Sequence, residues 1–205
     1  MKPTNQARGE GIYLVDSIFD LPKDDEHCKG VSYAITQKYI SNPFLIRGHK
    51  FDMRVYALVT SVDPLMVYVY GDGLARFATE PYSTDREDIT NNCIHLTNAT
   101  INRENTEAYL GDDEEDEFSG FLWTLSMLKE YLNMVGVDWE IIWFQIQDII
   151  RKTIILGYSS MRMEGEGLKS SYNCYKLLGF DILLDASLKP WVMEVFIIQL
   201  KTYTI

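Results

Sequence analysis

The sequence predicts an α+β protein built mainly from antiparallel strands with packed helices. Polar and apolar residues alternate around residues 50–77, apolar residues recur at helical spacing between residues 121 and 153, and two apolar stretches separated by a short turn fill residues 177–195. The chain has 205 residues, of which 46% are hydrophobic and 24% are charged. This length and composition suffice to bury a core and favour one domain or a large piece of one.

The first third of the chain is expected to be rich in strands. Residues 12–15 follow Gly9-Glu10-Gly11, and residues 32–40 end at Ser41-Asn42-Pro43, both sequences typical of turns. Each apolar stretch is therefore expected to form a strand bounded by a loop.

A charged row is expected on the next strand, which begins near Lys50. Lys50, Asp52 and Arg54 fall on one face of an extended chain, whereas Phe51 and Met53 fall on the other. Two cations beside one acid suit a phosphate and a substrate carboxylate, the latter bound by the planar fork of arginine. Weak ion pairs on an exposed strand would give the same pattern, and both interpretations stay open here.

This strand is expected to start a three-stranded meander. Asp63-Pro64 predicts a turn, residues 65–70 predict a second strand, and Gly71-Asp72-Gly73 predicts another turn before a strand at residues 74–77. The meander would place the charged row beside neighbouring strands.

Two amphipathic helices are expected next. Phe121, Leu125, Leu128, Leu132 and Val135 recur at spacings of four and three residues, which predicts a helix ending near Gly136. Asp138 suits the N-cap of a second helix, whose core face would carry Ile142, Ile146, Ile149 and Thr153. Residues 161–171 contain Gly165 and Gly167 and predict a loop.

Charge and cysteine content exclude several classes of function. The net charge of -11 argues against a nucleic-acid partner and against an anionic membrane surface, since both require clustered Lys and Arg. The acidic run at residues 112–117 is expected to be a solvated loop. Cys28, Cys93 and Cys174 form no CxxC pair, and no signal peptide or membrane span is expected, so an intracellular protein is predicted.

The last two strands carry a candidate metal site. A turn centred at residues 187–188 would pair Leu184 with Trp191 and Asp181 with Glu194. Two carboxylates about 5 Å apart on one face repel each other unless a cation compensates them. Mg²⁺ fits, because it takes one or two carboxylates together with phosphate oxygens and waters. Two exposed acids on an ordinary hairpin are the alternative interpretation.

Other patterns in the chain are weaker. Arg8-Gly9-Glu10-Gly11 suits a phosphate cradle of backbone N–H groups, with Lys2 as a point charge, but it is not a Walker loop. His49 and His95 belong to no nucleophile or zinc motif, and neither GxSxG nor HExxH occurs. Hydrolase chemistry is therefore not indicated.

Six motifs in order resemble the tubulin tyrosine ligase-like family, and together they extend from residue 1 to about residue 195. In chain order they are Lys2-Pro3 with Ala7-Arg8-Gly9-Glu10-Gly11-Ile12, Gln37-Lys38-Tyr39-Ile40-Ser41-Asn42-Pro43, Lys50-Phe51-Asp52-Met53-Arg54, Gly73-Leu74-Ala75-Arg76-Phe77-Ala78-Thr79-Glu80, His95-Leu96-Thr97-Asn98, and Gly179-Phe180-Asp181 with Leu188-Lys189-Pro190-Trp191. The fourth motif is most similar to the polyglutamylase branch.

The resemblance implies an ATP-grasp fold and an ATP-dependent acid–amino-acid ligase. The expected reaction adds free L-glutamate to glutamate side chains of tubulin C-terminal tails through an acyl phosphate, with ATP and Mg²⁺ as cofactors. Residues 1–195 would be a partial catalytic domain, incomplete at both ends, and residues 196–205 a divergent tail. The implied location is the cytoplasm and the microtubule cytoskeleton, including the cilium or flagellum basal body and axoneme.

The resemblance also assigns roles by position. Lys2, Arg8 and Gly9 would meet the phosphates, Gln37, Lys38, Tyr39 and Ile40 would line the adenine and ribose pocket, and Lys50, Asp52, Thr97 and Asn98 would complete the nucleotide site. Arg54 and Arg76 would bind carboxylates of the amino acid or of the acceptor tail as catalytic residues, and Asp181 and Glu194 would hold Mg²⁺.

Two departures from the family pattern bear on activity. Glutamate-adding members usually continue Tyr-Ser-x-Asn-Lys after His-Leu-Thr-Asn, whereas this chain has Ala99-Thr100-Ile101-Asn102-Arg103, so Ala99, Thr100 and Arg103 join Arg76 as candidate substrate-binding residues. Phe196 stands where the family has a metal-binding Asn, and it cannot ligate a cation. Phe196 motivates a catalytically inactive nucleotide- or microtubule-binding fragment as one alternative function. The acidic net charge motivates a ligase for a non-tubulin acceptor as another, because tubulin tails are themselves acidic.

Overall fold

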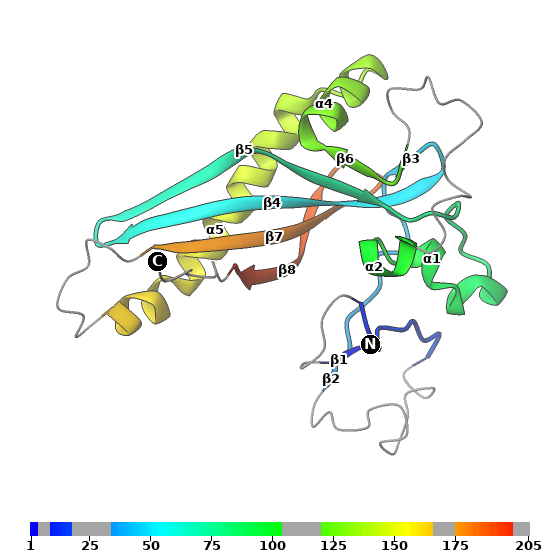
Figure 1. Cartoon of the computed structure of the whole chain (residues 1–205), viewed down its shortest axis with the longest axis horizontal. Helices are drawn as coiled ribbons and strands as arrows, with labels where there is room; N and C mark the ends of the chain where they lie inside the picture. The colour runs from blue at the N-terminus through cyan, green and yellow to red at the C-terminus, as the bar shows by residue number, and fades with distance from the viewer. Residues whose placement is uncertain (4–8, 18–33, 104–119, 166–174, 199–205) are drawn as a thin grey trace, which may run out of the picture. The chain divides into compact units, whose positions relative to one another are not determined.

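The computed structural model describes residues 1–3, 9–17, 34–103, 120–165 and 175–198 (Figure 1). It confirms the expected α+β class with a mostly antiparallel sheet. The chain divides into two compact units. Unit 1 consists of Met1–Phe51 and Arg76–Leu122, and unit 2 consists of Asp52–Ala75 and Trp123–Ile205. The acidic run at residues 112–117 lies outside the described residues.

A six-stranded sheet has the strand order β6-β5-β4-β7-β8, and β3 also pairs with β4. Its strands are β3 (Leu45–Ile46), β4 (His49–Val62), β5 (Leu65–Phe77), β6 (Leu122–Thr124), β7 (Lys176–Leu184) and β8 (Pro190–Ile197). A separate two-stranded sheet pairs β1 (Lys2–Pro3) with β2 (Ala34–Ile35). The short helices of unit 1 are the 3-10 helix η2 (Arg86–Thr90), α1 (Asn92–His95) and α2 (Ala99–Asn102).

The first third of the chain contains less strand than predicted. Residues 12–15 form no strand, although the backbones of Tyr13 and Met1 are hydrogen-bonded in both directions. Of the described residues 34–40, only Ala34 and Ile35 form a strand. In the described part of this region, the ladder between β1 and β2 is two residue pairs long.

The predicted turn at Asp63-Pro64 is present, whereas the turn at Gly71-Gly73 is wrong, since β5 runs through it without a break. A Cβ atom on Gly73 would lie 2.3 Å from the backbone oxygen of Arg54. The glycine therefore permits close approach of β4 instead of a turn. Asp72 accepts hydrogen bonds from the backbone N–H and the hydroxyl of Ser126.

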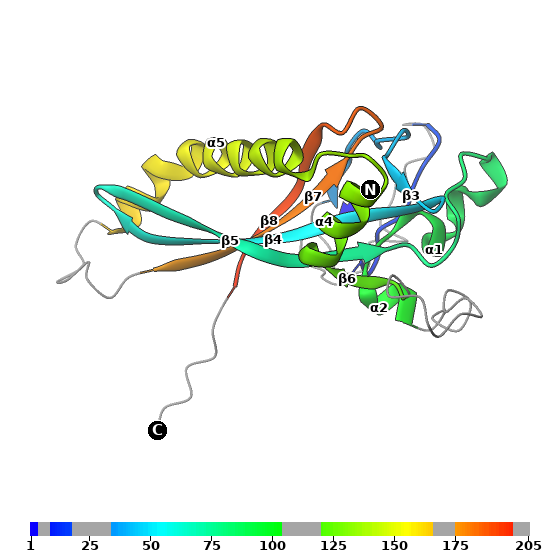
Figure 2. The same ribbon diagram turned by 90° about the horizontal axis from the view of Figure 1, so that it is seen from above.

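The core of unit 2 forms where helix α5 (Trp139–Gly165) lies along one face of the sheet (Figure 2). Its buried side chains recur every four residues at Ile142, Ile146, Ile150 and Ile154. The expected positions Ile149 and Thr153 flank this row and are only half-buried. On β4 the odd-numbered residues Met53, Val55 and Ala57 are fully buried, as their alternation predicts.

The boundaries of both helices differ from the prediction. Helix α4 (Leu125–Met134) starts four residues after Phe121, because the Thr124 hydroxyl caps it by accepting a bond from the Met127 N–H. Helix α5 continues to Gly165, so the predicted loop is wrong for residues 161–165. Within the described chain, no helix is both long and apolar enough to cross a membrane.

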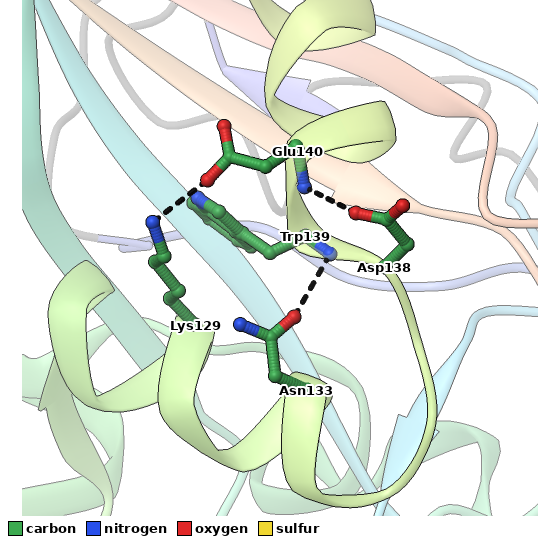
Figure 3. A network of polar contacts seen from close by, with 5 residues as sticks. All are labelled: Lys129, Asn133, Asp138, Trp139 and Glu140. Carbon is green, nitrogen blue, oxygen red and sulfur yellow. Dashed lines mark hydrogen bonds and ion pairs between the residues drawn. The ribbon is translucent and has the colours of Figure 1, made fainter.

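Polar contacts fix the connection between α4 and α5 (Figure 3). The backbone N–H of Glu140 donates to the Asp138 carboxylate at 2.9 Å, which confirms Asp138 as the cap. The Trp139 N–H donates to the side-chain oxygen of Asn133 at 3.2 Å. Lys129 and Glu140 form an exposed ion pair at 2.7 Å.

The β7–β8 hairpin reaches the predicted carboxylate pair through a different register. Leu184 pairs with Pro190 and not with Trp191 as predicted. A register shift between Asp181 and Ile182 then restores the pairing of Asp181 with Glu194. An additional residue on one strand moves the following pairs by one position, so the bulge corrects the displaced turn.

The turn of this hairpin is built around Asp185. Its carboxylate accepts bonds from the backbone N–H and hydroxyl of Ser187, the N–H of Lys189 and the indole N–H of Trp191. The bonds from the Ser187 hydroxyl and the Trp191 indole lower the pKa of Asp185 to about 2. The ionised carboxylate thus orders the backbone that sets the hairpin register.

Candidate functional site

In unit 1, polar side chains surround the ammonium group of Lys50. This lysine is only 8% exposed. Its Nζ donates to the backbone oxygen of His95 at 2.6 Å and to the hydroxyl of Tyr39 at 3.2 Å. The ammonium also lies 4.6 Å from the centre of the Tyr39 ring, within cation–π range. Lys50, Tyr39, Tyr82 and His95 are called the Lys50 cluster below.

His95 orients this cluster in its neutral form. Nε2 lies 3.1 Å from the backbone oxygen of Asp88, which only accepts, so Nε2 carries the proton and Nδ1 accepts from the Tyr39 hydroxyl at 3.1 Å. The rings of Tyr39 and Tyr82 both meet the imidazole edge-on. Burial lowers the pKa of His95, and Lys50 lowers it further. Burial also raises the pKa of Tyr39.

The cluster contains two predicted nucleotide-site residues, Lys50 and Tyr39. Sequence reasoning assigned no role to His95 or Tyr82. Neither follows a spacing rule that would have placed it beside Lys50, since His95 lies 56 residues from Tyr39 in the chain. The position of His95 within the His-Leu-Thr-Asn motif was the available signal.

A second contact in unit 1 joins Gly9 to Asn98, both predicted nucleotide-site residues. Gly9 has φ +86, and a Cβ atom there would lie 2.9 Å from Cγ of Asn98. Any side chain at position 9 would therefore collide with Asn98 and with Ile101, besides straining the backbone. Thr97 is buried next to Asn98, and Asn98 is the N-cap residue of α2.

The remaining predicted nucleotide-site residues are spread along the chain. Lys2 lies in β1, and Gln37 and Lys38 are exposed, whereas Ile40 is half-buried. Asp52 is buried on β4 in unit 2. Arg8 lies outside the described residues.

Among the predicted substrate-binding residues, Arg76 is the buried one. It lies on β5 in unit 1 and is 6% exposed. Ala99 and Thr100 are exposed on α2, and Arg103 is exposed just after it.

Asn102 holds α2 in place and was missed as an organising residue. It is fully buried, and its amide oxygen accepts from the backbone N–H and the hydroxyl of Thr79 at 2.9 and 2.8 Å. Its amide nitrogen donates to the backbone oxygens of Leu96 and Asn98. This side chain therefore fixes the loop that carries Thr97 and Asn98.

In unit 2, Arg54 and Asp181 form a bidentate ion pair between β4 and β7. Nε donates to Oδ1 and Nη2 donates to Oδ2, each at 2.9 Å. The two residues are direct partners in the strand register, and Asp181 faces Glu194 on its other side. Asp181 is buried, whereas Glu194 is exposed. Arg54 of the charged row thus forms an ion pair, but with a residue on the neighbouring strand, and the pair is partly buried instead of exposed.

Phe196 completes this group. It is the strand partner of Gly179, and a Cβ atom on Gly179 would lie 2.2 Å from Cζ of the ring. The ring therefore lies directly over the glycine. It reaches Arg54 on the next strand, with 4.7 Å between the guanidinium carbon and the ring centre. Arg54, Asp181, Glu194, Gly179 and Phe196 are called the Asp181 cluster below.

The donor types of the Asp181 cluster fit Mg²⁺. Asp181 and Glu194 offer carboxylate oxygens from directly paired strand positions, and Mg²⁺ needs only one or two carboxylates from the protein. Among the residues that the structure describes, no group of three or more His, Cys, Asp and Glu side chains is arranged to hold a metal ion. Both oxygens of Asp181 already accept bonds from Arg54, so a cation would compete with that arginine.

Comparison with known proteins identifies close relatives. The chain is 40% identical over 196 residues to tubulin monoglutamylase TTLL4 of Mus musculus and 42% identical over 200 residues to tubulin polyglutamylase TTLL6 of Mus musculus. It is 36% identical over 197 residues to tubulin polyglutamylase ttll-5 of Caenorhabditis elegans. Each match covers 95% of this chain but only 16%, 23% and 26% of the respective relative.

The match to a protein family extends over nearly the whole chain. Residues 1–197 match the family described as "Tubulin-tyrosine ligase family". This range includes all residues of the Lys50 and Asp181 clusters and extends to the last residue of β8. The chain belongs to the tubulin-tyrosine ligase family.

Proposed function

We propose that this chain is part of an ATP- and Mg²⁺-dependent ligase that adds glutamate to glutamate side chains of tubulin C-terminal tails. The observation that carries the proposal is the match of residues 1–197 to the family, together with relatives that are named as tubulin glutamylases. The proposed partners are tubulin or microtubules and free L-glutamate, without nucleic acid or membrane. The proposed location is the cytoplasm and the microtubule cytoskeleton, including basal bodies and axonemes.

The proposed reaction has two displacement steps and needs no protein nucleophile. The carboxylate of the acceptor glutamate attacks the γ-phosphorus of ATP, ADP leaves, and an acyl phosphate forms. The α-amine of the incoming glutamate then attacks the acyl carbon, loses a proton, and expels phosphate as the amide bond forms. Catalysis of this kind rests on positioning and on neutralising negative charge.

The residues of this chain have distinct parts in the proposal. In unit 1, Lys50 is the buried cation beside a nucleotide phosphate, and the ring of Tyr39 lines the nucleoside pocket. Lys2, Arg8, Gly9, Gln37, Lys38, Ile40, Asp52, Thr97 and Asn98 are the other proposed nucleotide-site residues. Arg54 and Arg76 bind carboxylates, aided by Ala99, Thr100 and Arg103. Asp181 and Glu194 are the proposed ligands of Mg²⁺, which supplies positive charge to phosphate oxygens.

The test is incorporation of labelled glutamate into tubulin by this chain in the presence of ATP and Mg²⁺. We expect label in the tubulin tails, and we expect Glu194→Gln and chelation of Mg²⁺ to abolish it. Lys129→Gln, which changes an exposed lysine outside both clusters, is the control and should retain activity. Labelled glycine in place of glutamate should not be incorporated. Absence of incorporation by the folded wild-type chain would overturn the proposal.

The Asp181 cluster favours a second candidate, a nucleotide- or microtubule-binding module without turnover. Phe196 offers no ligand atom, and Arg54 occupies both oxygens of Asp181. Calorimetry with ATP and Mg²⁺ separates the two candidates when it is combined with the incorporation assay. Binding with incorporation supports the ligase, whereas binding without incorporation supports the module.

A further inference from the structure

In the Asp181 cluster, Arg54 and a bound cation would compete for the same carboxylate, that of Asp181. Asp181 has two carboxylate oxygens, and Arg54 donates to each of them at 2.9 Å. A cation that binds Asp181 must take at least one of these oxygens, and the positive charge of Arg54 beside it opposes a second positive charge. Each oxygen keeps a second lone pair that a cation can use, but the charge of Arg54, while it is held on Asp181, weakens the binding of that cation.

Phe196 favours the arginine over the cation, because it contacts Arg54. Its ring covers the guanidinium with 4.7 Å between the guanidinium carbon and the ring centre. An aromatic ring stabilises a cation over its face and also removes water from that face. The bidentate pair and the ring contact act on the same planar group, so each holds it in the geometry that the other needs.

Gly179 makes the contact possible. The ring lies where a side chain at position 179 would be, with three ring atoms within 2.8 Å of a Cβ position. Cross-strand neighbours of Phe196 on β7 would otherwise block its path to β4. The glycine is therefore a spatial requirement for Phe196 to reach Arg54, and Gly179 is not among the residues with positive φ, so alanine is compatible with its backbone.

We propose that Phe196 is a positioning residue that latches Arg54 onto Asp181 and thereby weakens the binding of a divalent cation at the Asp181 and Glu194 pair. The inference rests on the proposed function in one respect, the assignment of Asp181 and Glu194 as the ligands of the cation. The latch makes the metal affinity of the chain depend on an aromatic side chain that donates no ligand atom. Release of Arg54 makes both the arginine fork and the Asp181 carboxylate available to ligands.

The test measures Mn²⁺ affinity, with Mn²⁺ as a spectroscopic probe for Mg²⁺, by electron paramagnetic resonance of free Mn²⁺. Phe196→Leu removes the ring and should tighten the Kd for Mn²⁺ by about 3- to 10-fold. Gly179→Ala should have the same effect, because its Cβ displaces the ring without changing Phe196 itself. Phe144→Leu, the same substitution on the exposed side of α5, is the matched control and should leave the Kd unchanged.

A double-mutant cycle separates positioning from a general structural effect. Arg54→Gln removes the competing charge and should tighten Mn²⁺ binding by at least about tenfold. In the Arg54→Gln background, Phe196→Leu should have no further effect, because the ring then has no guanidinium to hold. A structural role of Phe196 would affect Mn²⁺ binding equally with and without the arginine.

Three outcomes distinguish the latch from a metal site without a latch and from no metal site. Tighter binding by Phe196→Leu and Gly179→Ala that disappears in the Arg54→Gln background supports the latch. Unchanged or weaker binding in both single variants, with tighter binding in Arg54→Gln, overturns the latch but leaves the proposed metal site standing. No Mn²⁺ binding by Arg54→Gln overturns the metal site and the latch together.

Discussion

The hydroxyl of Tyr39 lies 3.1 Å from Nδ1 of His95, and their rings are perpendicular with centres 5.7 Å apart. Since Nε2 of His95 donates to the backbone oxygen of Asp88, Tyr39 donates to His95 and accepts from Lys50. The orientation of the buried lysine therefore depends on a neutral histidine. This relationship gives unit 1 a defined response to pH.

Protonation of His95 is expected to destabilise the folded chain. The pKa of His95 is lowered from 6.5 by burial and by Lys50, although Asp88 raises it. The unfolded chain therefore binds more protons between the folded-state pKa and about 6.5. The stabilising contribution should be complete above pH 6.5 and should decrease as the pH falls below it. Urea unfolding of the wild type from pH 5 to 7.5 measures this slope.

The control for this prediction is His95→Gln, which cannot titrate. Its free energy of unfolding should vary less with pH over the same range, because the histidine contribution is missing. An equal slope in both proteins would assign the pH dependence to other groups.

Lys50→Gln is expected to weaken ATP binding more than about tenfold, because it removes the buried positive charge proposed to face a phosphate. Calorimetry with ATP measures the change. Lys129→Gln serves as the matched control, since its ammonium is exposed and pairs with Glu140. Equal affinities of the two variants would exclude Lys50 from the nucleotide site.

Asn102→Ala is expected to destabilise the chain by about 2 to 3 kcal/mol, because it leaves the buried N–H of Thr79 without this acceptor and removes two donated bonds. Chemical denaturation gives the free energy of unfolding. Thr100→Ala, at an exposed position on the same helix, should change it by no more than about 0.5 kcal/mol. Similar costs for the two variants would contradict the organising role of Asn102.

The contacts between α4 and α5 in Figure 3 are expected to differ in strength. Asp138→Ala should cost about 1 kcal/mol, since the Glu140 N–H loses its capping acceptor. Lys129→Ala should cost at most about 0.5 kcal/mol, because both members of its ion pair are exposed and screened by water. Thermal or urea unfolding of both variants tests the order. A larger loss for Lys129→Ala would show that the ion pair is not a surface contact.

Much of the fold follows from local patterns. The alternation in residues 50–57 correctly predicts the buried face of β4, and the spacing of leucines and isoleucines correctly predicts two helices. In both patterns, the spacing of the apolar residues places them on one face of the strand or helix, and that face is buried because apolar surface is removed from water. The predicted turn at residues 71–73 is wrong because sequence alone does not distinguish a turn from the close approach of another strand, which Gly73 permits.

The candidate site was predicted in its residue types but not in its contacts. Asp181 and Glu194 are opposed as expected, although the turn that was expected to align them is displaced and a bulge compensates. The Tyr39–His95–Lys50 bonds and the Phe196 contact with Arg54 were not foreseen. Sequence comparison marked Phe196 as unable to bind a metal, but it could not say what the ring does instead.

The buried faces of the strands and helices follow from the sequence alone, because the local spacing of polar and apolar residues is enough to specify them. The family motifs are likewise read from short stretches of sequence. The partner of each charged group was settled only on folding, because Arg54 and Asp181 are 127 residues apart and meet through the register of two strands. Register depends on turn and bulge geometry, and a shift of one residue moves every side chain to the opposite face.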